Sequence, residues 1–239
     1  MGHIPRVYVA AKLGPGPVAL TGETASRLAT VLRARPGDEL RLFGGEGHEW
    51  QAVVRAAERG RVLAEVTGMA RQEPPPEPVV EAWLPIIRAQ RLEWAVEKCT
   101  EAGADIIRLA AMEFGQRGAE PSEAKLERLE RIAIEASEQC ERLYLPVIEP
   151  GGSLERLLGG FRGAVVAMER EGMGPAELAP LLPAQGRVAV VCGPEGGFSQ
   201  RELDLLRRKG ALFLRAGPNI LRAETAAVAG VVLVRALAG

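Results

Sequence analysis

Six consecutive residues, Glu73-Pro74-Pro75-Pro76-Glu77-Pro78, contain four prolines. Proline lacks a backbone N–H and restricts φ, so this run can neither continue a helix nor pair inside a sheet. Such a composition is typical of a stiff linker. The run therefore predicts two folded domains, residues 1–72 and 79–239, joined by a linker at residues 73–78. A chain of 239 residues is long enough for both domains to have a core.

The rare residue types exclude several kinds of chemistry. Both histidines, His3 and His48, lie in the first fifth of the chain, where a Ser–His–Asp triad is not expected. The three cysteines are about fifty residues apart, so no Cys/His metal site is expected. No apolar run approaches the ~20 residues that span a bilayer. An odd cysteine count without a signal peptide favours a reducing compartment, so we expect a cytoplasmic protein without membrane contact.

The first segment predicts a small β domain. Short runs of alternating apolar residues occur at 7–9, 39–43, 49–54 and 61–66, with glycine-containing turns between them. One helix is expected at 24–33, where Leu28, Val31 and Leu32 share a face. Several short strands and one helix within about 70 residues favour a small barrel.

The second segment alternates between strand-like and helix-like stretches. We expect strands at 79–87, 106–109, 163–168, 187–192 and 211–214, and helices at 93–102, 122–143, 199–210 and 226–237. This alternation is typical of an α/β domain whose mostly parallel sheet is covered on both faces. Such sheets bind ligands beyond the carboxyl ends of their strands. The loops after Met168, Cys192 and Leu214 are therefore the expected sites of chemistry.

The loop after Cys192 has the sequence Gly193-Pro194-Glu195-Gly196-Gly197-Phe198, and Ser199 and Glu202 behind it form a capping box for a helix. Glycines allow the backbone to approach a ligand closely and leave N–H groups free to bind it. The spacing matches neither the dinucleotide-binding nor the P-loop motif. An ordinary turn between a strand and a helix is the alternative interpretation.

The loop after Leu214 leads into a final helix that is apolar on almost every side. Such a helix has to be buried, either in the core or against a second subunit. Arg222, Glu224 and Thr225 lie at its start. Glu224 and Thr225 can serve as N-terminal caps, whereas a cation meets the unfavourable end of the helix dipole there. Arg222 is therefore the strongest candidate for a functional charge.

Two segments, GPEGGFSQRE at 193–202 and AGPNILRAETA at 216–226, closely resemble the RsmE family of ribosomal RNA methyltransferases in the SPOUT superfamily. The similarity extends to IPRVYV at 4–9, to VLRARPGD at 31–38 and to two middle helices. The resemblance implies a PUA-like N-terminal β-barrel, a C-terminal α/β domain with a trefoil knot, and a homodimer formed through that domain. It also implies S-adenosylmethionine-dependent methylation of uridine N3 in small-subunit (16S) ribosomal RNA. Knots are rare, and nothing in the composition predicts one.

When the matching segments are aligned, the resemblance places the family's cofactor loops after Met168, Cys192 and Leu214. These are the same strand ends at which a parallel sheet is expected to bind a ligand. The implied cofactor-binding residues are Met168, Glu169, Gly193, Glu195, Gly196, Gly197, Leu214, Ala216, Pro218, Asn219, Ile220, Leu221, Thr225 and Ala226. This chain departs from the family at Asn219, where a basic residue is usual, and at Ala223, where threonine is common. A family lysine is replaced in the region of Ile87 and Arg88.

Methylation of uridine N3 removes a proton from the Watson–Crick edge, so the base has to be unpaired. We expect Arg222 to stabilise the negative charge that develops on the uracil oxygens. The proton acceptor stays open between Glu138 and Glu224, because both histidines belong to the N-terminal domain.

Charge is unevenly distributed, with a net +3 over residues 1–72 and a net −4 over the remainder. Because RNA phosphates attract basic surfaces, the barrel is expected to supply much of the RNA affinity. The candidate residues are Arg6, Arg27, Arg33, Arg35 and Arg41. The expected partner is small-subunit ribosomal RNA or the 30S subunit. Two alternatives stay open: a SPOUT enzyme acting on a ribose 2′-OH or a tRNA base, and a non-catalytic RNA-binding protein.

Overall fold

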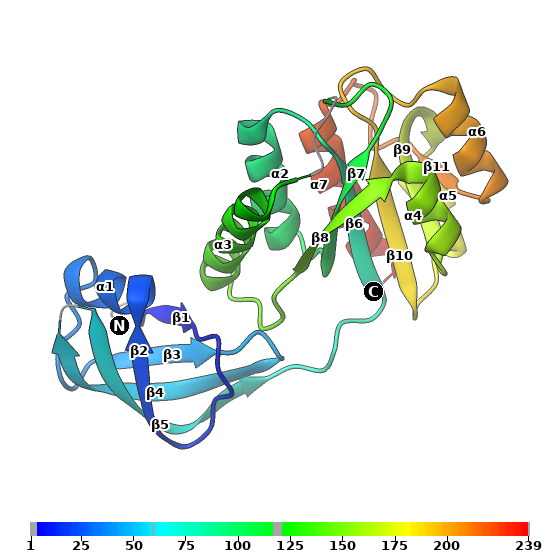
Figure 1. Ribbon diagram of the computed structural model, residues 1–239. Helices are drawn as coiled ribbons and strands as arrows, with labels where there is room; N and C mark the ends of the chain where they lie inside the picture. Colours follow the sequence, from blue (N-terminus) through cyan, green and yellow to red (C-terminus); the bar gives the residue numbers. More distant parts are fainter. Residues whose placement is uncertain (1–3, 59, 117–120, 239) are drawn as a thin grey trace. The chain divides into compact units, whose positions relative to one another are not determined.

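The computed structural model describes residues 4–58, 60–116 and 121–238, so His3 lies outside the described residues (Figure 1). Contacts divide the chain into two compact units, Met1–Pro75 with Ser137–Leu145, and Pro76–Ala136 with Pro146–Gly239. This grouping differs from the predicted limits, which place residues 137–145 in the second domain. The proline-rich stretch 73–78 contains neither helix nor strand.

The first unit contains a five-stranded sheet with the order β1-β3-β4-β5-β2. β1 and β3 are parallel, and the other pairs are antiparallel. Leu28 of the single helix is fully buried against Leu40, Leu42 and Val62 of the sheet. The predicted β domain with one helix is therefore confirmed. Its elements are β1 Arg6–Tyr8, β2 Gly16–Thr21, α1 Gly22–Thr30, β3 Glu39–Phe43, β4 His48–Glu58 and β5 Arg61–Gln72.

One strand of this unit, β2, was not predicted, and two others are longer than expected. The sequence of β2 begins with a glycine and a proline, which are typical of turns. β4 and β5 pair through three shifts of register, which break the regular alternation of apolar residues. The alternation of apolar residues therefore predicts only those parts of the strands that pair without a shift of register.

The second unit is an α/β domain with a six-stranded sheet of order β11-β9-β10-β6-β7-β8. Every strand pair in it is parallel, as predicted. The strands are β6 Val79–Pro85, β7 Ile106–Ala111, β8 Val147–Ser153, β9 Ala164–Met173, β10 Arg187–Cys192 and β11 Leu212–Leu214. The helices are α2 Ala89–Glu101, α3 Glu123–Gln139, α4 Leu154–Gly160, α5 Pro175–Leu178, η1 Ala179–Leu181, α6 Gln200–Arg208 and α7 Ala223–Ala238.

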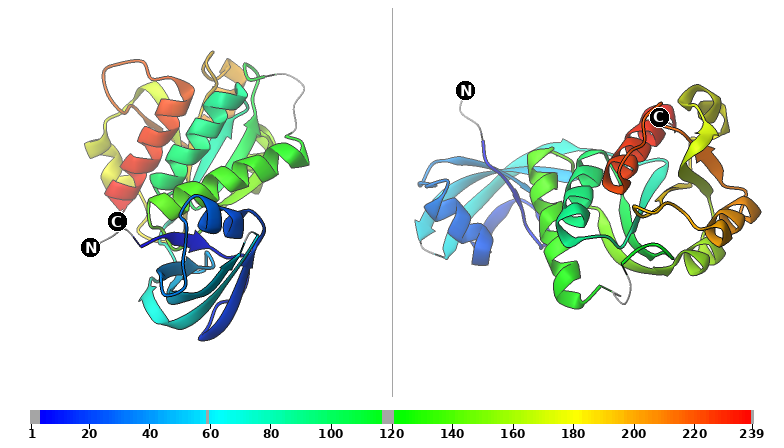
Figure 2. Two further views of the ribbon diagram at one scale, coloured as in Figure 1. Left: turned by 90° about the vertical axis from the view of Figure 1, so that its left-hand side faces the viewer. Right: turned by 90° about the horizontal axis from the view of Figure 1, so that it is seen from above.

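Helices cover both faces of this sheet (Figures 1 and 2). Alternate residues of β6 point to opposite faces: Val80 and Leu84 pack with α2, α3 and α7, whereas Trp83 packs with α4 and α6. β8 and α4 were not predicted, because Pro150-Gly151-Gly152 interrupts the apolar pattern. α2 begins four residues earlier than the predicted start at Glu93, so it includes Arg91.

Helix α7 packs against the sheet at unusually close range. A Cβ on Gly230 would lie 2.6 Å from Val190 Cγ1 and 2.7 Å from Met168 Sδ, so only glycine fits there. The opposite side of α7 is open, with Val232 exposed. The core therefore buries only one side of this helix, and burial of the other side against a second subunit stays a prediction. No helix in the described ranges is both long and apolar enough to cross a membrane.

Two buried cysteines, Cys99 of α2 and Cys192 of β10, are expected not to react with alkylating reagents. Burial raises the pKa of the Cys99 thiol to about 12 and that of Cys192 well above its usual value. Both thiols therefore stay protonated at about pH 8, where a thiolate is needed for alkylation. We expect iodoacetamide to modify only the half-buried Cys140 in the folded protein, as read by peptide mass spectrometry. Equal labelling of all three cysteines without denaturant would contradict this expectation.

Candidate functional site

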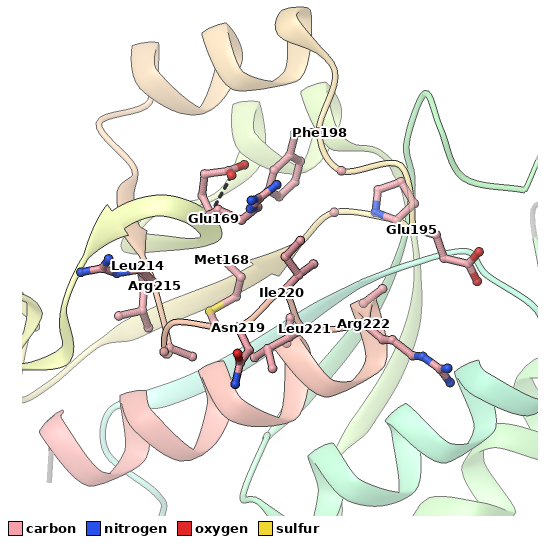
Figure 3. Close-up of a pocket in the computed structure, with 18 of the residues that line it drawn as sticks. Met168, Glu169, Glu195, Phe198, Leu214, Arg215, Asn219, Ile220, Leu221 and Arg222 are labelled. Atoms are coloured by element: carbon pink, nitrogen blue, oxygen red, sulfur yellow. Dashed lines mark hydrogen bonds between the residues drawn. The ribbon is translucent and has the colours of Figure 1, made fainter.

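A pocket of about 840 Å³ lies in the second unit, where the ends of β9, β10 and β11 meet (Figure 3). Three segments supply most of its lining: residues 168–171, 193–198 and 214–223. Arg91 of α2 and Ala226 of α7 complete it. These are the three strand ends that the sheet topology selects, and the volume is in the range of small-molecule sites.

The first segment belongs to a strand that lies between two others and loses one of them. β9 pairs with β10 as far as Met168, opposite Cys192, and it pairs with β11 at Ala167 and, after a shift of register, at Met173. The predicted end of this strand at residue 168 is therefore wrong, because the strand leaves β10 there without ending. Residues 168–171 lie within this shift of register, along the pocket.

The second segment is a tight glycine turn. The Gly197 N–H donates to the Pro194 carbonyl at 2.8 Å, and Gly197 has a φ of +74°, which favours glycine. A Cβ on Gly193 would lie 3.0 Å from the Phe198 nitrogen, so a side chain there would strain the closed turn. The loop therefore presents backbone to the pocket.

The predicted capping box at the start of α6 is confirmed. The Ser199 hydroxyl accepts from the Glu202 N–H at 3.3 Å, and the Glu202 carboxylate accepts from the Ser199 N–H at 2.8 Å. The same carboxylate accepts from the Glu113 N–H at 2.9 Å. Glu202 thus joins the glycine turn to the loop that follows β7.

The third segment turns from β11 into α7. The Ala226 N–H donates to the Arg222 carbonyl at 2.8 Å, which places Arg222 immediately before the helix. Figure 3 shows Met168 and Ile220 extending into the same space. Apolar side chains therefore line the middle of the pocket, and charged ones lie around it.

Arg91 connects two of these segments electrostatically. Its guanidinium forms an ion pair with Glu195 of the glycine turn, and its Nε lies 3.9 Å from Oε1 of Glu224. Glu224 is only 8% exposed, and its Oε2 accepts no hydrogen bond within the described ranges. A buried carboxylate oxygen without a donor is costly, so it is a group ready to bind one. Arg222 is exposed and has no side-chain ion pair among the residues that the structure describes.

Thirteen of the fourteen predicted cofactor residues line this pocket. The exception is Thr225, which is exposed and lies outside the lining. Sequence reasoning missed Arg91, Arg170, Glu171, Pro194, Phe198, Arg215, Gly217 and Ala223. All but Arg91 lie within two residues of a predicted residue along the chain. Arg91 carries no local signal, because only the packing of α2 brings it to the pocket.

Glu138 belongs to the first unit and is not among the residues that line the pocket. Its Oε1 accepts from the Tyr8 N–H at 2.8 Å, and its Oε2 accepts from Arg27 at 2.6 Å. Both carboxylate oxygens are therefore engaged within the barrel unit. These bonds favour a structural role for Glu138, so Glu224 is the stronger candidate for the base.

Arg6 needs a similar correction as an RNA contact. Its side chain is 6% exposed and donates to Glu49 and to the carbonyls of Ser137 and Arg142 at 2.6 to 2.7 Å. These bonds explain why residues 137–145 group with the first unit. Arg27 is partly engaged by Glu138, whereas Arg33 and Arg35 are exposed. Of the predicted set, Arg33 and Arg35 have the accessibility that a phosphate contact needs.

Comparison with known proteins agrees with this arrangement. The family model described as RNA methyltransferase domain matches residues 74–235, and the one described as RNA methyltransferase PUA domain matches residues 20–67. Ribosomal RNA small subunit methyltransferase E (RsmE) of Mycobacterium bovis is 34% identical over 233 residues, covering 92% of this chain and 87% of that protein. The chain belongs to the RsmE family. The Bacillus subtilis RsmE is 29% identical, with coverage of 87% and 85%.

Solved structures of RsmE-like proteins have the same fold along almost the whole chain. The RsmE of Neisseria gonorrhoeae, solved bound to S-adenosylmethionine, aligns with a TM-score of 0.86 at 26% identity, covering 98% of both chains. A methyltransferase of Legionella pneumophila, solved with bound S-adenosylmethionine, aligns with a TM-score of 0.87 at 25% identity and the same coverage. The predicted fold class, a PUA-like domain followed by an α/β methyltransferase domain, is therefore confirmed.

Proposed function

We propose that this RsmE-family chain transfers a methyl group from S-adenosylmethionine to N3 of a uridine in small-subunit (16S) ribosomal RNA. The observation that carries the proposal is the pocket itself. Three loops at adjacent strand ends enclose a space of cofactor size, and its lining includes Arg222, which forms no ion pair with any residue that the structure describes. The family supplies the substrate class, and the pocket supplies the residues for the chemistry.

The pocket residues fit the proposed cofactor. The glycine turn exposes backbone at Gly193 and Gly197, where hydroxyls and ring nitrogens can be hydrogen-bonded. Met168, Ile220 and Leu221 supply apolar surface for a flat base, and carboxylates at Glu169 and Glu195 balance a positive charge. We infer that these segments hold S-adenosylmethionine. When bound, that group supplies an electrophilic methyl for the reaction.

Two residues of this chain would then act on the uracil ring. The N3 proton passes to a base as N3 bonds to the methyl carbon, and the electron pair of the old carbon–sulfur bond stays on sulfur. Arg222 stabilises the negative charge that spreads over O2 and O4 as the proton leaves. Glu224 is the proposed proton acceptor, since its Oε2 is buried beside the pocket and accepts from no donor in the described part of the chain.

The barrel and helix α7 are the parts of the chain that we expect to bind RNA and to form a dimer. We infer that the barrel, residues 1–72, contributes RNA affinity through the exposed Arg33 and Arg35. The linker at 73–78 and the methyltransferase domain at 79–239 complete the proposed organisation. The open side of α7, with Val232 exposed, supports a homodimer formed through this domain. A trefoil knot, the 30S subunit as substrate and a cytoplasmic location are further expectations from the family.

Mapping of methylated nucleotides tests the proposed function directly. Small subunits from cells that lack this enzyme, incubated with the purified protein and labelled S-adenosylmethionine, should gain one base methylation on a uridine of 16S ribosomal RNA. Nuclease digestion and mass spectrometry would place the methyl on the base or on the ribose. A methyl found on ribose, on transfer RNA or nowhere would refute the proposal.

A further inference from the structure

The loop that follows β7, residues 112–116, presents an exposed aromatic ring beside the pocket. Phe114 is 53% exposed, although phenylalanine is among the residues most often buried. Only 4% of the residues are aromatic, so an exposed aromatic ring is uncommon in this chain. An exposed aromatic face beside a ligand site offers a surface on which a flat ring can stack.

The backbone around Phe114 is fixed on both sides. The Glu113 N–H donates to the buried carboxylate of Glu202 at 2.9 Å, and the Gln116 N–H donates to the Ile86 carbonyl at 2.9 Å. Between them, the Gly115 N–H closes a turn on the Met112 carbonyl at 3.0 Å. The ring is therefore held in solvent by a rigid loop, which lowers the entropic cost of binding against it.

The ring lies directly against the glycine turn of the pocket. A Cβ added to Gly196, which lines the pocket, would lie 3.0 Å from Cβ of Phe114 and 3.3 Å from its Cγ. The missing side chain at residue 196 therefore leaves room for the ring. Glu202 joins both loops, so the ring and the turn keep a constant relation to each other.

We propose that Phe114 is a stacking platform for an unpaired nucleobase of the RNA substrate at the edge of the pocket. The inference rests on the proposed function, because a target uridine has to leave its helix and its neighbours lose their stacking partners. An aromatic face replaces that lost stacking without requiring a particular base. Phe114 is thus a positioning residue for RNA, whereas the cofactor is held by the three pocket loops.

Steady-state kinetics on small ribosomal subunits tests this role with three variants. Phe114→Leu keeps an apolar side chain but removes the π face, and we expect the KM for RNA to rise about 10- to 100-fold. Phe114→Trp should restore a KM near that of the unchanged protein. Val147→Ala is the matched control, because Val147 is also exposed but begins β8, at the opposite end of the sheet. The affinity for S-adenosylmethionine, measured by calorimetry, should stay the same in all three.

The possible outcomes separate the two proposals. An unchanged KM in Phe114→Leu overturns the stacking role while leaving the methylation of 16S ribosomal RNA intact. A loss of S-adenosylmethionine affinity in Phe114→Leu also overturns it, since the ring would then only support the glycine turn. If the unchanged protein methylates no ribosomal RNA in this assay, the proposed function fails and the stacking role fails with it.

Discussion

Replacement of Arg222 by alanine is expected to lower kcat about 100- to 1,000-fold, because one charge-stabilising donor at a reacting centre has about this effect. The guanidinium lines the pocket and has no side-chain ion pair within the described ranges, so its charge is available to the substrate. S-adenosylmethionine affinity should change little, since glycine-turn backbone and apolar side chains surround most of the pocket. Single-turnover methylation and calorimetry on the same preparation measure both quantities.

Two further variants sharpen this prediction. Arg222→Lys keeps the charge but loses the planar fork, so we expect it to recover only part of the lost rate. Arg201→Ala serves as the control, because Arg201 is exposed on α6, is not among the residues that line the pocket, and pairs with Glu155. Turnover of Arg222→Ala at the rate of the unchanged protein, with cofactor bound, would show that this charge has no role in the chemical step.

Replacement of Glu224 by glutamine is expected to lower kcat about 100- to 10,000-fold, the usual contribution of a positioned base. Glutamine has nearly the same shape, so the close packing at the start of α7 is retained while the proton acceptor is lost. Single-turnover methylation by Glu224→Gln and by the unchanged enzyme measures the ratio of the two rates.

Glu138→Gln is the matched comparison for Glu224→Gln. The amide oxygen of glutamine can still accept from the Tyr8 N–H, while the ion pair with Arg27 is lost. We expect a modest loss of stability, about 0–1 kcal/mol for a partly exposed pair, and an unchanged kcat. If Glu138→Gln lowered kcat and Glu224→Gln did not, the assignment of the base would be reversed.

The loops at 193–198 and 214–226 were predictable because their signals are local. Glycine turns, a capping box and the change from strand to helix all lie within about ten residues of each other. Parallel sheet topology then brings the carboxyl ends of neighbouring strands together. The same local reasoning failed at β8, where Pro150-Gly151-Gly152 interrupts the pattern, and at β9, which leaves β10 after Met168 but continues beside β11.

The role of each charged residue depends on its contacts with segments that are far away in the sequence. A local sequence pattern does not predict such contacts. Glu138 and Glu224 are equally plausible bases in the sequence, yet one is bound by Tyr8 and Arg27 while the other is buried beside the pocket without a donor. Arg6 is basic and near the N-terminus, but it is buried among acceptors that are 43 to 136 residues away along the chain.

The sequence alone therefore determined the α/β class, most of the strands and helices and the three loops of the pocket, because hydrophobic period and turn chemistry act over a few residues. Only the tertiary structure decided which side chains are free to react. It brought Arg91 between Glu195 and Glu224, and it held Phe114 in solvent against Gly196. Burial and pairing depend on partners from distant segments, and packing alone selects them.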